Sequence, residues 1–272
     1  LSVGSPTWFT AKHHRIMSQI QILLVSLLIP ILANAQAEKH PLSQDQRNSL
    51  RSNIDQAIES YDAELKKKPE SVDLLSRRGD MYLFAGKFSK SVADFEKMIE
   101  LDPTTDAPHW RLGIAYYYID NFKKGMDQFS KYHAYDAVDR ENGVWKFFCQ
   151  ANLEGIEKAQ QNMLPYTRFD RHPFPDVYDL LAGKNGITAE SILKAAEESK
   201  ESQSAKVRRL FFAHLYIGMW HEIHGRKKEA LHHLNLATAN QYGLSTRTYM
   251  WQVARIHFEQ LSAGNYRIPL KK

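Results

Sequence analysis

Residues 72–103 read VDLLSRRGDMYLFAGKFSKSVADFEKMIELDP, and this stretch decides the fold. In its second half, apolar side chains stand at positions 88, 92, 95 and 99, in steps of four, three and four. Such spacing puts them on one face of an α-helix. Asp102-Pro103 marks the end of that helix, because the residue before a proline is pushed out of the helical region.

The same pattern returns after 34 residues. The matching residues are Gly79, Tyr82, Phe88 and Phe95 in one copy and Gly113, Tyr116, Phe122 and Phe129 in the next. One period earlier, Ile54, Ile58, Tyr61 and Leu65 fall on Phe88, Val92, Phe95 and Ile99. A fixed period of this length predicts stacked helix pairs. A glycine inside a helix costs about 1 kcal/mol relative to alanine, so we interpret Gly79 and Gly113 as contact points between paired helices.

The repeat resembles the tetratricopeptide repeat (TPR) family, whose helix–turn–helix units have small residues at the helix crossing and a proline at the unit end. In the first unit the family positions are held by Leu75, Gly79, Tyr82, Gly86, Phe88, Ser91, Phe95 and Pro103. The resemblance implies an all-α fold, a TPR-like α-solenoid of antiparallel helix pairs. Its parts are an N-terminal helix at 43–68, TPR units at 72–103, 106–137 and 211–242, divergent helices at 138–204 and a capping helix at 245–261.

Residues 1–35 have the pattern of a secretory signal peptide. Lys12 and Arg15 precede an uncharged apolar run at 20–32, and Ala33-Asn34-Ala35 follows as an A-x-A cleavage pattern. The run is shorter than the about 20 residues that a membrane-spanning helix needs. An uncleaved signal anchor and a buried core helix are the alternatives. We expect export to the periplasm or the cell exterior, and a mature solenoid at 36–272 without a transmembrane span.

The order of these parts narrows the resemblance. A signal peptide, two good units, a divergent middle, one further unit and a long final helix are similar to the NlpI-type envelope TPR proteins of bacteria. This resemblance implies envelope proteins as partners, among them peptidoglycan hydrolases or a protease. Those proteins are lipoproteins, whereas the single cysteine here is Cys149, so no lipid anchor is expected. Met17, directly before the apolar run, is an alternative start residue.

Composition excludes several kinds of site. A chain with one cysteine cannot form an intramolecular disulfide, a zinc site built on several thiolates or a cysteine-ligated iron–sulfur cluster. We expect Cys149 to be buried as a small apolar side chain. The formal charge is +5, and the first 35 residues hold two of the 36 basic residues and no acid. The remaining surface is mixed, which excludes a nucleic-acid footprint. No nucleotide-binding or hydrolase motif occurs, so we expect no cofactor and no bound metal.

A group of histidines supports an alternative hypothesis. His221 and His224 are three residues apart, so they can share a helical face, and His214 precedes them in the sequence. Histidines spaced in this way are one pattern of a transition-metal site. The TPR template instead places His214 and His221 between helices, and two histidines still lack a third ligand. An enzyme or metal-binding protein that uses His214, His221 and His224, or the segment 165–204, is therefore the alternative to a binding protein.

By resemblance, the first helix of each TPR unit lines a concave groove for a partner. The positions on that face are Arg77, Asp80, Leu83, Phe84, Trp110, Arg111, Ile114, Tyr117 and Tyr118. Aromatic and arginine side chains are typical of protein interfaces, although we expect about half of these aromatics to pack between repeats. The sequence predicts a non-catalytic adaptor that binds other proteins or peptides, with homodimer formation through the terminal helices as a further alternative.

One familiar kind of partner is disfavoured. TPR domains that clamp the C-terminal carboxylate of cytosolic chaperones use Lys and Asn where this chain has Ser76 and Asp80. An acidic side chain at that place repels a carboxylate. We therefore expect a partner of different chemistry.

Overall fold

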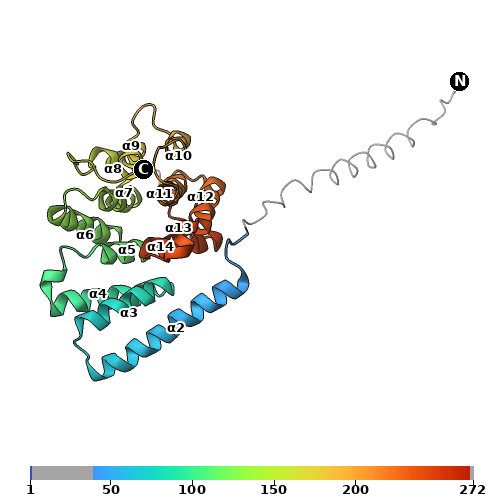
Figure 1. The fold of residues 1–272 in the computed structure, drawn as a ribbon. Helices are drawn as coiled ribbons and strands as arrows, with labels where there is room; N and C mark the ends of the chain where they lie inside the picture. The colour runs from blue at the N-terminus through green and yellow to red at the C-terminus, as the bar shows by residue number, and fades with distance from the viewer. Residues whose placement is uncertain (2–38, 270–272) are drawn as a thin grey trace. The chain divides into compact units, whose positions relative to one another are not determined.

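The computed structural model describes Leu1 and residues 39–269, so the expected signal peptide lies outside the described residues from position 2 onward. All regular structure in 39–269 is helical and this part contains no strand, which confirms the all-α, TPR-like solenoid (Figure 1). The helices are α2 (Gln44–Lys67), α3 (Val72–Phe84), α4 (Phe88–Leu101), the 3-10 turn η1 (Pro103–Thr105), α5 (Trp110–Tyr118), α6 (Phe122–Tyr135), α7 (Arg140–Glu154), α8 (Ile156–Gln161), α9 (Phe174–Leu181), α10 (Ala189–Glu197), α11 (Gln203–Ile223), α12 (Lys227–Ala239), α13 (Gln241–Thr246) and α14 (Tyr249–Ser262).

In both repeat units, a glycine of the first helix contacts a phenylalanine ring of the second helix. A Cβ atom on Gly79 would lie 2.5 Å from Cε1 of Phe95, and one on Gly113 would lie 2.6 Å from Cζ of Phe129. Both distances are shorter than a side chain tolerates, so each glycine lets α3 or α5 approach its partner helix. The interpretation of Gly79 and Gly113 as helix contact points is confirmed.

The divergent middle supplies the centre of the core. α7 is buried at ten consecutive positions, from Asn142 to Ala151. Cys149 is fully buried among them, as expected, and burial raises the pKa of its thiol. α10 begins after Thr188, whose hydroxyl accepts a hydrogen bond from the backbone N–H of Ser191 at 3.1 Å.

The C-terminal region differs from its prediction. The expected single helix at 245–261 is divided into α13 and α14 by Arg247, which has a φ of 46°. This left-handed residue redirects the chain, so that α14 packs along α12 and also reaches α3. Figure 1 shows α14 between α5 and the α11–α13 region.

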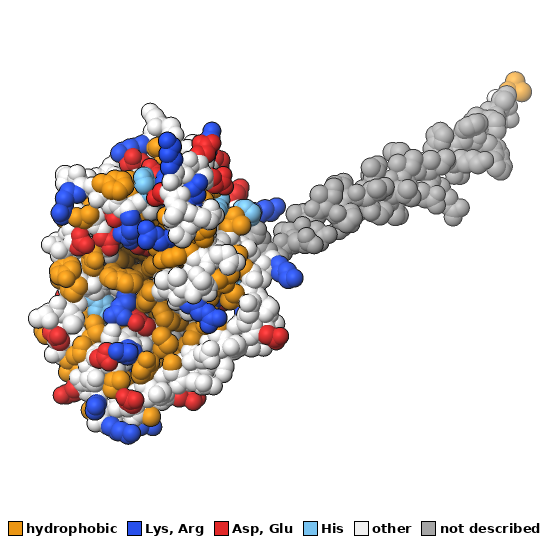
Figure 2. Space-filling model, viewed as in Figure 1, with side chains coloured by type: hydrophobic (Ala, Val, Ile, Leu, Met, Phe, Trp, Pro, Cys, Tyr) orange, Lys and Arg blue, Asp and Glu red, His pale blue; other side chains and the backbone are white. Residues whose placement is uncertain are grey.

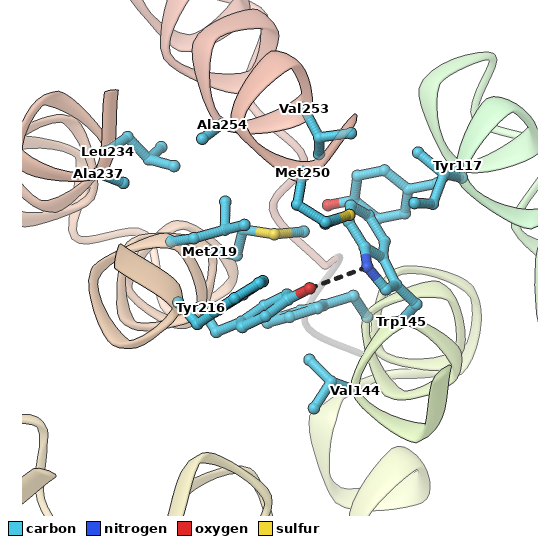
Figure 3. Packing of buried hydrophobic residues seen from close by; sticks show 14 of the residues in the cluster. Tyr117, Val144, Trp145, Tyr216, Met219, Leu234, Ala237, Met250, Val253 and Ala254 are labelled. Atoms are coloured by element: carbon cyan, nitrogen blue, oxygen red, sulfur yellow. Dashed lines mark hydrogen bonds between the residues drawn. The ribbon is translucent and has the colours of Figure 1, made fainter. Parts of the chain in front are cut away.

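α14 is a core helix and not an outer cap. Nine consecutive residues from Met250 to Phe258 are buried, and Leu261 is buried as well. Nine consecutive buried residues include all faces of a helix, so other parts of the protein must cover α14 on several sides. In Figure 3, Met250 and Val253 lie beside Tyr117 of α5, while Ala254 lies toward Leu234 of α12.

None of the helices described in 39–269 combines the length and apolar character required to cross a bilayer.

Candidate functional site

One wall of the predicted groove is a stripe along α3. Asp73, Ser76, Arg77, Asp80 and Phe84 follow one another at helical spacing, so they share a face. Arg77 and Asp73 form an ion pair at 2.9 Å, and their side chains are 59% and 67% exposed. This end of the stripe is open to solvent.

The opposite wall begins with Trp110 and Arg111 at the start of α5. His109 fixes this start, because its Nδ1 accepts a hydrogen bond from the backbone N–H of Leu112 at 3.1 Å. Between the two walls lies a hollow of about 630 Å³. We call it the α3–α5 groove, and it is lined by Val72, Asp73, Ser76, Met98, Thr104, Thr105, Pro108, His109, Trp110 and Arg111.

An ion pair joins the two walls. Nη1 of Arg111 lies 2.5 Å from Oδ2 of Asp80, and Nη2 donates to the hydroxyl of Ser76 at 2.9 Å. Burial raises the pKa of Asp80 to about 6, although Arg111 acts in the opposite direction. The second carboxylate oxygen of Asp80, Oδ1, is buried and has no hydrogen-bond partner. Asp80 therefore positions Arg111 at an energetic cost to its own solvation.

Trp110 of the groove contacts Tyr249, the first residue of α14. Its ring packs edge-on against Trp110 at 4.8 Å between centroids and against Phe84 at 5.0 Å. Its hydroxyl is buried without a hydrogen-bond partner, and burial raises its pKa well above the ordinary value, with a further contribution from Asp80. Nothing in the sequence connects Tyr249 with the groove, because the two helices are more than 130 residues apart.

The far half of the predicted groove is filled by the chain itself. Ile114 and Tyr117 have no exposed surface and Tyr118 has 3%. The hydroxyl of Tyr118 lies 3.0 Å from Nδ1 of His257 in α14, and the guanidinium of Arg267 lies over the rings of both tyrosines. These three residues therefore do not line an open groove, which corrects the prediction for them.

The aromatic positions on this face differ in exposure. Tyr117 and Tyr118 are buried, whereas Phe84 and Trp110 remain partly exposed. Leu83, on the same stretch of α3, is fully buried. Of the predicted site residues, Trp110 and Arg111 line the α3–α5 groove, and Arg77 is exposed beside it, paired with Asp73 of the lining. Asp80 and Phe84 lie outside the lining.

A buried polar network holds the C-terminal segment over α5. The carboxylate of Glu222 has no exposed surface, and it accepts hydrogen bonds from Nε2 of His257 at 2.8 Å and from the backbone N–H of Arg267 at 2.6 Å. Nε of Arg267 in turn donates to Asp120 at 2.9 Å. A buried carboxylate is stable only with such partners. No sequence pattern marks these residues, because Glu222 lies in a helix with several other charged side chains and Arg267 follows α14.

The histidines of the alternative hypothesis lie between α11 and α12. Nδ1 of His214 and Nδ1 of His233 are 2.9 Å apart, and the ring of His221 stacks on that of His233 at 5.2 Å. Burial lowers the pKa of all three to about 4. His224 is directed elsewhere, with Nδ1 2.7 Å from the carbonyl oxygen of Trp220. Within 39–269 no three His, Cys, Asp or Glu side chains are placed to hold a metal ion together.

Titratable groups also meet where the segment 165–204 touches α7. Nη2 of Arg171 donates to Glu141 at 2.6 Å, and its Nη1 lies 3.1 Å from Asp170 and 3.4 Å from Asp139. The hydroxyl of Tyr216 also donates to Glu141. Burial raises the pKa of Glu141 to about 7, against the influence of Arg171. These contacts tie α7 to the loop before α9, which is a structural role.

Comparison with known proteins agrees with the repeat architecture. No family model matches the chain. It is similar to the Protein SGT1 homolog of Bos taurus, 26% identical over 101 residues, which cover 37% of this chain and 30% of that protein. It is also similar to the Hsp70-Hsp90 organizing protein of Triticum aestivum, 28% identical over 128 residues, which cover 46% of this chain and 22% of that protein. The chain thus spans less than a third of these relatives, and the similarities support a TPR-type helical protein.

Proposed function

We propose that this protein is a non-catalytic adaptor that binds a segment of a partner protein in the α3–α5 groove. The observation that carries the proposal is the placement of Trp110 and Arg111 side by side at the edge of a hollow of about 630 Å³. Tryptophan and arginine are the side chains that most often dominate binding energy at protein interfaces. Asp80 holds Arg111 in place, so the site is organised before a partner arrives.

The lining defines the chemistry of the bound segment. Between the charged residues the hollow presents Trp110, Val72 and Pro108 with the hydroxyl groups of two threonines. An extended segment fits this lining when it inserts an apolar side chain against Trp110 and uses its backbone for hydrogen bonds. The exposed pair of Asp73 and Arg77 offers both charges at the rim, which sets the orientation of the segment.

The names of the relatives support binding over catalysis. The wheat relative is named an organizing protein of Hsp70 and Hsp90, which describes a protein that works on other proteins. In this chain the arginine of the groove is already paired with Asp80, and an acidic side chain stands where a carboxylate clamp has Asn. We therefore propose an internal segment of the partner, and not its terminal carboxylate, as the bound element.

The setting that we propose is the cell envelope. The support is the pattern of residues 1–35, with Lys12 and Arg15 before an apolar run and an A-x-A sequence after it. The similarity of the order of parts to NlpI-type proteins suggests exported partners, such as peptidoglycan hydrolases or a protease. Homodimer formation remains a prediction that light scattering on residues 36–272 tests.

The experiment compares groove variants with a matched surface variant. Trp110→Ala combined with Arg77→Glu removes the aromatic anchor and reverses a rim charge, whereas Phe169→Ala removes an aromatic ring that is 68% exposed on a loop outside the groove. Tyr117 is unsuitable because it belongs to the core. We expect the groove variant to lose a partner in pull-downs from the envelope fraction that the native protein and Phe169→Ala both retain. Equal recovery by all three folded proteins would contradict the proposal.

A further inference from the structure

A second hollow lies between α2, the turn that joins α3 to α4, and α14. Its volume is about 420 Å³, and we call it the α2–α14 cleft. In the view of Figure 2 the surface near these elements is hollowed, with hydrophobic side chains inside and Lys or Arg side chains beside them. The cleft shares no lining residue with the α3–α5 groove.

The cleft has an apolar side. Ile54 and Ile256 are buried there, while Leu50 and Phe84 remain partly exposed. Leu50 lies on α2 and Phe84 ends α3, so the exposed apolar surface spans two elements. This surface offers contact area to an apolar side chain.

The charges of the cleft are unequal. Four cationic side chains and two carboxylates line it. Lys87 pairs with Asp55 at 3.2 Å and Arg255 pairs with Glu259 at 2.8 Å, so both carboxylates are matched. Arg255 also donates to the carbonyl oxygen of Phe84 at 2.7 Å. The cationic excess therefore lies on the other two arginines.

Those two arginines are Arg47 and Arg51 of α2. Arg47 donates to the carbonyl oxygen of Leu42 at 2.6 Å and to the amide oxygen of Gln44 at 2.5 Å, both of which are uncharged acceptors. Arg51 is exposed and has no hydrogen bond or ion pair within the described residues. Positions four apart on a helix are neighbours on one face, about 5–6 Å apart between Cβ atoms.

We propose that the α2–α14 cleft is a docking site for an acidic peptide segment of a partner protein. Two carboxylates of the segment meet Arg47 and Arg51, and an apolar side chain between them packs on Leu50 and Phe84. The unmatched charge of the cleft is positive, and guanidinium groups bind carboxylates with two hydrogen bonds. The apolar surface of the cleft lies beside these guanidinium groups. A phosphate backbone makes no use of the apolar side, which favours a peptide over a nucleic acid.

The test measures binding of a fluorescein-labelled peptide, Glu-Glu-Leu-Glu-Glu-Leu-Glu-Glu, by fluorescence anisotropy. We expect saturable binding to the full chain that weakens between 50 and 300 mM NaCl. Arg51→Glu and Arg47→Glu each replace an attraction by a repulsion, so each should weaken binding about five- to tenfold. Lys66→Glu, the same charge change at the other end of α2, should leave the affinity within about twofold of the native value.

Two comparison probes make the result specific. A peptide with lysine in place of every glutamate should not bind, and a peptide with serine in place of leucine should bind more weakly, because it loses the apolar contact. The proposal is overturned if the acidic peptide does not bind, or if Lys66→Glu weakens binding as much as Arg51→Glu. Equal binding of a single-stranded oligonucleotide would also overturn it, since the site would then attract any polyanion.

Discussion

Tyr249, the first residue of α14, packs edge-on against Trp110, the first residue of α5, with ring centroids 4.8 Å apart. Trp110 also lines the α3–α5 groove, so the contact joins α14 to a residue of that groove. On one side of it Arg77 and Arg111 remain accessible, and on the other Ile114 and Tyr117 are covered. The C-terminal helix therefore forms part of the site that we propose and also part of the core.

The unpartnered hydroxyl of Tyr249 predicts opposite effects for two substitutions. Tyr249→Phe removes a buried polar atom and keeps the ring contacts, so we expect the free energy of unfolding to stay equal or to rise by up to about 1 kcal/mol. Tyr249→Ala removes the contacts with Trp110 and Phe84 and should lower it by about 2–4 kcal/mol. Urea denaturation measures both. A loss of stability in Tyr249→Phe would show that the hydroxyl has a partner.

The repeated glycine contact predicts a destabilising gain of a methyl group. Gly113→Ala improves helix propensity by about 1 kcal/mol, but its Cβ would meet the ring of Phe129 at 2.6 Å. We expect a net loss of about 1–3 kcal/mol in the free energy of unfolding. In the double variant with Phe129→Leu, the smaller side chain leaves room for the methyl group, so the two losses should not add. Additive losses in urea denaturation would contradict the contact.

Glu141 predicts a stability that falls as the pH rises. Its pKa is raised from 4.5 to about 7 in the folded protein. Between these values the unfolded chain releases a proton that the folded protein retains, so the free energy of unfolding should decrease from pH 4.5 to pH 7, by an amount on the order of 2 kcal/mol. Glu141→Gln cannot titrate and should lose this decrease. Thermal denaturation across this pH range compares the two proteins, and identical pH profiles would contradict the raised pKa of Glu141.

The stacked histidines predict the opposite pH dependence, a free energy of unfolding that falls as the pH decreases. The pKa of His233 is lowered from 6.5 to about 4, so below pH 6.5 the unfolded chain binds a proton that the folded protein does not. The free energy of unfolding should therefore fall as the pH decreases from 6.5 to 4. His233→Asn should reduce this fall. Acid sensitivity in His233→Asn equal to that of the native protein would be inconsistent with the stacking of His233 between His214 and His221.

The sequence allowed the local elements to be predicted, because they depend on short-range patterns. The period of 34 residues predicted the helix pairs. Gly79 and Gly113 predicted where the paired helices touch, and the structure places the rings of Phe95 and Phe129 there. The cap at Thr188 was also predictable, since a side-chain hydroxyl and the next three residues suffice to form it.

The extent of the site was not predictable, because it depends on where the chain returns. Arg247 adopts a left-handed conformation that a non-glycine residue rarely takes, and this turn directs α14 across α5. Tyr117 and Tyr118 carry the same residue types that an open groove would have, and only the contacts with His257 and Arg267 distinguish them. The α2–α14 cleft was missed for the same reason, since its walls lie at opposite ends of the described chain.

The most direct measurement of the central claim is site-specific photocrosslinking from the groove in the native host. Arg77→p-benzoylphenylalanine places the reactive group on the open wall of α3, and Lys97→p-benzoylphenylalanine places it on α4, outside the groove, as the matched control. We predict a protein adduct from position 77 that is absent from position 97 and that disappears when Trp110→Ala is added. The same adducts from both positions, or an adduct that persists without Trp110, would contradict a partner-binding groove between α3 and α5.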